Sequence, residues 1–280
     1  MTDPKISLTA ARSRSLAALR EAFIRQRPDI RLDANGYADD FRDTLLTRVS
    51  PQDFEADLSA GDGNELQTKF RAIHSSSGLA VNCFAPFRRQ IVDLSIKRGE
   101  TFDGLQFERK CPTGLRGGRS PNLDVLLSGL AGIVGVESKL SEYLSRHSAK
   151  FSPAYEQQIR DDRRDSGYFR EMVRLMAAPD SYVLLDAAQL IKHAFGLAHT
   201  FKDRPTSLLY LYWEPANPED NPAFAAHRAE IAEFADRVAG STPSFSAMSY
   251  PEFGRELEFA GPAWVQAHLA ELRQRYLVLI

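Results

Sequence analysis

Three charged residues, Asp124, Glu137 and Lys139, stand inside two short runs of otherwise apolar residues. The runs read LDVLL and IVGVESKL, and a glycine-containing turn, SGLAG, separates them. Buried charges are costly unless they are paired or bind an ion. Residues two apart in a strand point to the same face, so we expect Glu137 and Lys139 to project side by side. The pattern therefore predicts a polar site built into a buried sheet.

The two apolar runs are predicted to form an antiparallel hairpin whose turn lies near Gly129 to Gly132. This register puts Asp124 opposite Glu137 on the neighbouring strand. Two carboxylates close together in a poorly hydrated setting repel each other, and a divalent cation removes that repulsion. Oxygen ligands favour Mg²⁺, with Mn²⁺ as a substitute, and Mg²⁺ leaves room for phosphate oxygens. With the ammonium group of Lys139 added, such a site could hydrolyse a phosphodiester.

The same residues also allow interpretations in which they have no catalytic role. Glu137 could pair with an arginine, or Lys139 with Asp124, as a structural ion pair in the fold. The strand could also be a surface strand that only looks buried. A metal site, a structural pair and a surface strand all remain open at this point.

An acid two residues before a lysine is a weak pattern, and it recurs at Asp3-Pro-Lys5 and Glu108-Arg-Lys110. The second recurrence is a rival, because Asp93 precedes Glu108 by fifteen residues. Its surroundings are more polar than LDVLL and IVGVESKL, so the context favours the hairpin that carries Asp124. The histidines, His193 among them, lack metal-ligand spacing and are interpreted as ordinary polar residues.

Apolar periodicity predicts the elements around the hairpin. The first sixty residues are predicted to be helical, and a further helix is predicted to begin at Asn64, with Leu66, Phe70 and Ile73 along one face. Strands are predicted at LQFERK, in the hairpin and at TSLLYLYWEP, with helices between and after them. This order predicts the α/β class, with a mixed central sheet flanked by helices.

The hairpin resembles the PD-(D/E)XK, or restriction-endonuclease-like, nuclease superfamily. PNLD at 121–124 and VESK at 136–139 carry the resemblance. It implies a restriction-endonuclease-like core with extra N- and C-terminal helices. It further implies Asp124 and Glu137 as metal ligands and Lys139 as the catalytic lysine. The proline and the aspartate are separated by Asn-Leu, so the first half of the motif departs from the superfamily pattern.

The resemblance extends to one further acid and sets the predicted boundaries. Many members carry another acid on the helix before the strands, and Glu65 occupies a matching place as a third metal-binding residue. Glu65 could equally be a helix-surface carboxylate that pairs with Lys69. Residues 64–214 are predicted to be the nuclease-like core, 1–63 a helical region packed on it, and 215–280 a helical extension of the same domain.

Charge is distributed unevenly along a chain whose net charge is only −2. Residues 88–119 hold eight basic side chains against four acidic ones, which suits a region that faces phosphates. Arg109, Lys110, Arg116 and Arg119 lead into the Asp124 strand and are predicted to contact the phosphates of a nucleic acid. A solvated basic loop is the alternative interpretation.

The remaining sequence features bound the class of protein. No apolar run is long enough to span a membrane, and the first residues lack a secretion signal. Cys83 and Cys111 show no metal or disulfide spacing, so a reducing cytoplasm is expected.

We therefore expect a Mg²⁺-dependent nuclease that hydrolyses phosphodiester bonds, as a DNA endonuclease in restriction, defence or repair. An inactive nucleic-acid-binding module of the same fold and a metal-independent structural or interaction protein are the alternatives. Cleavage of both DNA strands usually needs two active sites, which a homodimer would supply.

Overall fold

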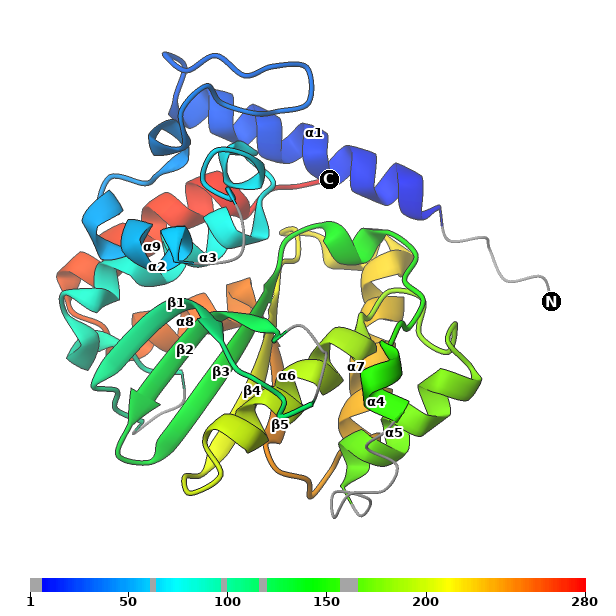
Figure 1. The fold of residues 1–280 in the computed structure, drawn as a ribbon. Helices are drawn as coiled ribbons and strands as arrows, with labels where there is room; N and C mark the ends of the chain where they lie inside the picture. Colours follow the sequence, from blue (N-terminus) through cyan, green and yellow to red (C-terminus); the bar gives the residue numbers. More distant parts are fainter. Residues whose placement is uncertain (1–6, 61–63, 97–99, 116–119, 157–165) are drawn as a thin grey trace.

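The computed structural model describes residues 7–60, 64–96, 100–115, 120–156 and 166–280. A five-stranded mixed sheet in the order β1-β2-β3-β4-β5 forms the centre of the fold (Figure 1). The first three strands pair antiparallel, whereas β4 runs parallel to β3 and to β5. The strand bounds are β1 Gly104–Lys110, β2 Asn122–Gly129, β3 Gly132–Lys139, β4 Thr206–Tyr212 and β5 Ser244–Ser249.

Helices cover both faces of this sheet. α3 and α8 contact one face, α6 and α7 contact the other, and α1 packs against α9 on the outer side of α3 (Figure 1). Among the described residues the helices are α1 Leu8–Gln26, α2 Glu55–Ser59, α3 Ser76–Phe84, α4 Pro153–Glu156, α5 Gly167–Ala177, α6 Ala187–Thr200, α7 Pro222–Arg237, α8 Tyr250–Ala260 and α9 Ala263–Tyr276. The predicted α/β class, with a mixed sheet between helices, is confirmed.

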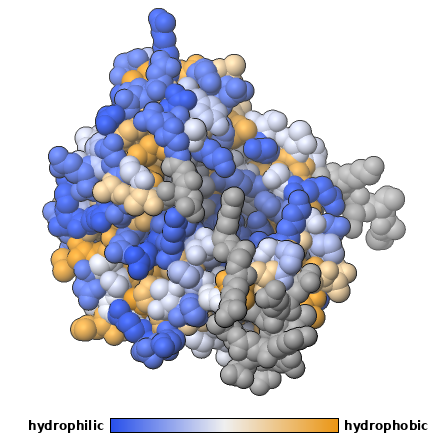
Figure 2. Space-filling view, viewed as in Figure 1, coloured by the Kyte–Doolittle hydropathy of each residue, from blue (hydrophilic) through white to orange (hydrophobic). Residues whose placement is uncertain are grey.

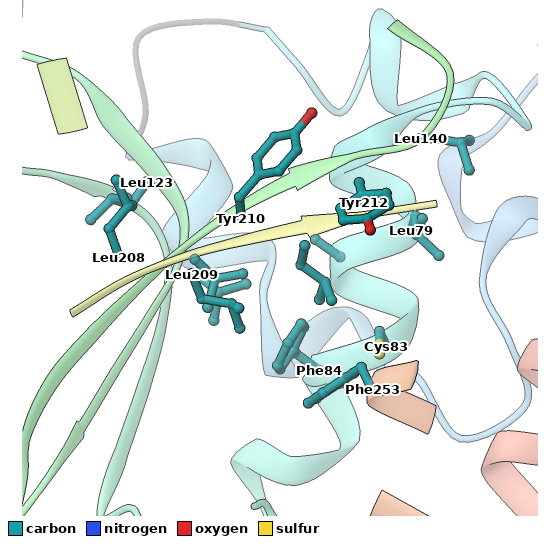
Figure 3. Close-up of a cluster of buried hydrophobic side chains, with 14 of the residues drawn as sticks. Leu79, Cys83, Phe84, Leu123, Leu140, Leu208, Leu209, Tyr210, Tyr212 and Phe253 are labelled. Atoms are coloured by element: carbon teal, nitrogen blue, oxygen red, sulfur yellow. The ribbon is translucent and has the colours of Figure 1, made fainter. Parts of the chain in front are cut away.

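The interior strand β4 shows why the sequence folds into layers. Nearly all of its residues are buried, as expected for a strand covered on both faces. Leu209 points toward Phe84 of α3, whereas the neighbouring Tyr210 points to the opposite side (Figure 3). The outer surface is mostly hydrophilic on the side shown in Figure 2, with hydrophobic residues scattered among polar ones.

The prediction of a helix that begins at Asn64 is wrong. The chain from Asn64 forms turns and a short 3-10 helix at Lys69–Arg71, and α3 begins only at Ser76. Ser75 caps α3 by accepting a hydrogen bond from the N–H of Gly78. The apolar stripe of this segment is buried as predicted, but turns bury it without a regular helix.

Two other expectations differ from the structure. Residues 27–54 are not helical throughout, because short 3-10 helices and turns connect α1 to α2. β5 was not predicted, since its sequence SFSAMS contains no β-branched residue. This strand lies within 215–280, which was predicted to be helical. The division of the chain at 63 and 214 stays a prediction. Among the described residues, no helix is both long and apolar enough to pass through a bilayer.

Candidate active site

The hairpin formed by β2 and β3 has the predicted register. Val125 pairs with Val136, and Gly129 pairs with Gly132 across the turn. Asp124 and Glu137 come next beyond the Val125–Val136 pair, so they lie beside each other on adjacent strands. Asp124 Oδ2 also accepts a hydrogen bond of 2.6 Å from the backbone N–H of Ser138 on β3.

Glu137 and Lys139 converge, as their spacing on one strand face predicts. Lys139 Nζ lies 2.5 Å from Glu137 Oε1, and the two side chains are 15% and 2% exposed. Burial opposes ionisation of Glu137, but the charges of Lys139 and His193 outweigh it and lower its pKa to about 2. Burial also works against the charge on Lys139, yet the nearby carboxylates raise its pKa above the ordinary value. The lysine and the carboxylate thus favour each other's charged forms.

Asp124 is an acid whose charge the surrounding protein compensates only in part. Burial raises its pKa well above the ordinary value, and the negative charges of Glu137 and Glu108 raise it further. Lys139 and the N–H of Ser138 oppose this rise without cancelling it. The site thus holds more carboxylates than its single lysine can neutralise.

Glu108 is a site residue that the sequence analysis assigned to a rival hairpin. Its neighbours Phe107 and Arg109 pair with Val125 and Leu123, which places Glu108 beside Asp124 on the adjoining strand β1. Burial raises the pKa of Glu108 to about 8, with further contributions from the charges of Glu65 and Glu137.

Asp93, the other acid of that rival hairpin, accepts a hydrogen bond from Trp264 on α9. It does not pair with Glu108 as a second site would require. The sequence signal for Glu108 was present, because its acid-x-Lys triplet lies in the predicted strand next to Asp124.

Glu65 reaches the site from a turn and not from a helix. It is half-buried, and its Oε1 accepts a hydrogen bond from the hydroxyl of Ser77 on α3. Its negative charge contributes to the raised pKa of Glu108. Glu65, which the resemblance matches to a further metal-binding acid, is therefore close to the other acids. It lies in a turn, however, so the prediction that it lies on a helix is wrong.

His193, interpreted from the sequence as an ordinary polar residue, contacts the site directly. It lies on α6, is 1% exposed, and holds its Nε2 2.8 Å from Glu137 Oε2. The contact is short but poorly aligned, and neither ring nitrogen has a hydrogen-bond partner among the described residues. α6 can approach β3 so closely because Gly135 has no side chain. A Cβ at this glycine would lie 2.8 Å from a methyl group of Leu197.

The predicted phosphate-contacting residues are placed only in part. Arg109 and Lys110 are exposed at the end of β1, on the strand that carries Glu108. Arg116 and Arg119 lie outside the described residues. Their proposed contact with nucleic acid stays a prediction.

The donor chemistry of the site fits a hard divalent cation. Its carboxylates are oxygen ligands of the kind that Mg²⁺ and Mn²⁺ prefer. Glu137 Oε2 is buried and has no hydrogen-bond partner among the described residues. In the described parts of the chain, no three His, Cys, Asp or Glu side chains are gathered closely enough to hold a metal ion as they stand. The ammonium group of Lys139 instead occupies one side of Glu137.

Comparison with known proteins agrees with this fold. The sequence model of a protein family described as "Restriction Endonuclease associating with ARP" matches residues 16–277. The chain belongs to this family. The restriction-endonuclease-like fold and superfamily predicted from PNLD and VESK are thereby confirmed. No curated protein and no solved structure matches the chain.

Proposed function

We propose that this member of the family is a divalent-cation-dependent nuclease that hydrolyses phosphodiester bonds, with DNA as its substrate. Asp124 and Glu137 would hold Mg²⁺ or Mn²⁺, and Glu65 would complete the shell of ligands, directly or through a water. When bound, the cation supplies positive charge at the phosphate and lowers the pKa of a coordinated water.

The chain's own residues have distinct roles in this proposal. Lys139, held next to Glu137, orients the attacking water and stabilises the negative charge that develops on the phosphate. The backbone N–H of Ser138 fixes the carboxylate of Asp124 against β3. Arg109 and Lys110 would bind the phosphate backbone beyond the reacting group.

The observation that carries the proposal is the surplus of negative charge around Lys139. The charge of Glu137 raises the pKa of both Asp124 and Glu108, which lie on the next two strands of the sheet, and Lys139 opposes this rise at each of them. A buried surplus of this kind is unfavourable for a structural core. It suits a site that is completed by a cation.

Plasmid cleavage tests the proposal most directly. The wild-type protein should cleave plasmid DNA in the presence of Mg²⁺ or Mn²⁺ and not in the presence of EDTA. Lys139→Ala and Asp124→Ala should each remove this activity, while circular dichroism shows that the fold persists. If both variants cleave as the wild type does, the assigned site is wrong.

A metal-independent structural role is the second candidate, and the Glu137–Lys139 ion pair favours it. In this case the ammonium group of Lys139 would be the only cation that Glu137 needs. Thermal unfolding at increasing Mn²⁺ concentration separates the candidates, because a cation site gains stability by mass action and a closed ion pair does not. An inactive nucleic-acid-binding module would bind DNA and respond to salt, but would leave the plasmid intact.

The wider setting of the activity is also part of the proposal. The family description names an association with ARP, and we propose that this chain acts together with such a partner in restriction, defence or repair. A homodimer would provide the two sites needed to cut both strands of a duplex. Sedimentation of the chain alone and on DNA tests the dimer. We expect the activity to be cytoplasmic.

A further inference from the structure

We propose that a groove between α1 and the segment that follows β3 binds a backbone phosphate of the DNA substrate, other than the phosphate that reacts. This inference rests on the proposed function and assigns a further part of its DNA-binding surface. The geometry that points to it is a pair of arginines, Arg12 and Arg146, which line the groove from two separate segments of the chain.

The groove lies where the N-terminal half of α1 packs over the chain that leaves β3 (Figure 1). Its volume is about 480 Å³. Arg12 and Ser13 of α1 line one side, and Arg146 lines the other. The apolar side chains of Leu16 and Leu144 lie between these polar groups and the core. The groove is therefore a concave surface with two guanidinium groups on a mostly apolar base.

The groove carries positive charge that its own residues do not balance. No acid is among its described lining residues. Residues 8–20 of α1 contain three arginines and no acid. Glu142 lies nearby in the 3-10 helix η6, Glu142–Leu144, but its carboxylate accepts hydrogen bonds of 2.9 Å from the N–H groups of Leu140 and Ser141. The nearby acid is thus engaged by the backbone.

Arg12 and Arg146 are available to a ligand. Both are exposed, and neither has an ion pair or a hydrogen bond with a described residue. Arg174, by contrast, pairs with Glu171. A guanidinium group can hold a phosphate through two parallel hydrogen bonds, and a hydroxyl such as that of Ser13 can add another. A single exposed arginine would simply be solvated, whereas two in one groove without an acid suit a phosphodiester.

The groove is also close to the proposed active site. η6 follows β3 directly, and the hydrogen bonds from Leu140 and Ser141 fix it against the strand end that carries Lys139. Phosphates are spaced regularly along a DNA strand, so a strand held at Lys139 presents others to the surface around it. The groove is placed to receive one of them.

The salt dependence of DNA binding tests the inference. Fluorescence anisotropy of a labelled duplex would be measured in Mg²⁺ with full-length protein that carries Lys139→Ala, so that the DNA stays intact. In this parent, the slope of log affinity against log salt should fall by about 1 in Arg12→Ala or Arg146→Ala, and by about 2 in the double variant. The fall should be equal for unrelated DNA sequences, because phosphate contacts do not read bases.

Two further variants separate a phosphate contact from other effects. Arg255→Ala is the matched control: Arg255 is also exposed, but it lies on α8 outside the groove, so the slope should not change. The double variant Arg12→Lys/Arg146→Lys keeps both charges and should keep the slope of the parent. If it loses as much slope as the double alanine variant, the charges are not what binds DNA and the inference is wrong.

The outcomes separate failure of this inference from failure of the proposed function. An unchanged slope in the double alanine variant, with DNA bound by the parent, overturns the role of the groove and leaves the nuclease proposal standing. A parent that binds no DNA overturns both. An equal fall in Arg255→Ala would assign the effect to net charge and would also overturn the inference. Because both arginines are exposed, we expect the alanine variants to unfold at the same temperature as the parent.

Discussion

Glu137 on β3 and Glu171 on α5 are both carboxylates that the fold removes from water, with exposed fractions of 1% and 2%. Glu171 accepts hydrogen bonds from the guanidinium group of Arg174 and from the hydroxyl of Tyr182. Glu137 accepts a hydrogen bond from Lys139 on one oxygen, lies 2.8 Å from His193 Nε2 on the other, and shares its surroundings with other acids. The protein can therefore satisfy a buried carboxylate with its own donors, and it does so at Glu171. The cation site that we propose would account for the different surroundings of Glu137.

The substitution Glu137→Gln should have the largest effect, and this effect is on the rate of DNA cleavage. Loss of a cation-binding carboxylate should reduce the rate by about 10²–10³-fold, similar to removal of a transition-state-stabilising donor. It should also remove the Mn²⁺-dependent stabilisation, which for a wild-type site at 100 times its Kd is about 2.7 kcal/mol. Cleavage kinetics and thermal unfolding with Mn²⁺ measure the two quantities. If Glu137→Gln keeps both the cleavage rate and the Mn²⁺-dependent stabilisation, the proposed difference between Glu137 and Glu171 is wrong.

Glu171→Ala should have the opposite effect, with lower stability of the fold and unchanged Mn²⁺ binding. Removing one partner of a buried ion pair is strongly destabilising, but Arg174 is 29% exposed and can regain water. We therefore expect the free energy of unfolding to fall by about 2 kcal/mol, less than for a fully buried pair. Urea denaturation measures this loss, and Mn²⁺ titration should show an unchanged affinity. A weaker Mn²⁺ response in Glu171→Ala would show that the two regions are coupled.

His227 extends the comparison to a buried group that the fold keeps neutral. It is fully buried on α7, its Nε2 lies 3.0 Å from the Tyr210 hydroxyl, and its ring stacks on Tyr143. Burial lowers its pKa to about 3, and positive charge nearby lowers it further. The groups facing His227 are Tyr143, Tyr210, Tyr212, His147 and Arg228.

The sign of the resulting pH dependence follows from proton uptake. The unfolded chain protonates this histidine below about pH 6.5, whereas the folded chain does so only near pH 3. Stability is therefore lost as the pH falls through this window, at up to about 1.4 kcal/mol per pH unit from this group. His227→Gln should reduce the slope of unfolding free energy against pH in urea denaturation between pH 6 and 4. An unchanged slope would mean that His227 is already protonated in the fold.

The smallest expected effect concerns His193. Its imidazole contacts Glu137 from α6, so we expect it to position this carboxylate without binding substrate. His193→Gln should weaken Mn²⁺ binding about tenfold, the lower end of the range for groups that orient metal ligands. His193→Asn, whose amide nitrogen lies nearer the backbone, should weaken it more. Equal affinities for the wild type and both variants would assign His193 to packing alone.

The hairpin could be predicted from the sequence because its determinants are local. Short apolar runs define β2 and β3, and two glycines around a short turn fix their register. This is enough to place Asp124 beside Glu137 and to put Lys139 on the same strand face as Glu137. The same reasoning identifies the α/β class, since β1, β4 and most helices have clear apolar patterns.

The residues missed from the sequence depend on distant contacts. His193 reaches Glu137 only because Gly135 lets α6 pack closely on β3, and nothing near His193 in the sequence indicates this. Glu108 joins the site through strand order, which an isolated acid-x-Lys triplet does not define. The helix at Asn64 was mispredicted because buried turns can produce the same apolar spacing as a helix. β5 contains no β-branched residue, so it is not recognised without its neighbour β4.

Ser138, the residue between Glu137 and Lys139, has a consequence for the order in which the proposed site is assembled. Its hydroxyl lies 2.7 Å from that of Tyr250, 112 positions further along the chain, while its N–H holds Asp124. A growing polypeptide emerges from the ribosome with the acids and the lysine well ahead of the tyrosine that anchors the residue between them. We expect the proposed site to stay incomplete until Tyr250 has been synthesised and docked.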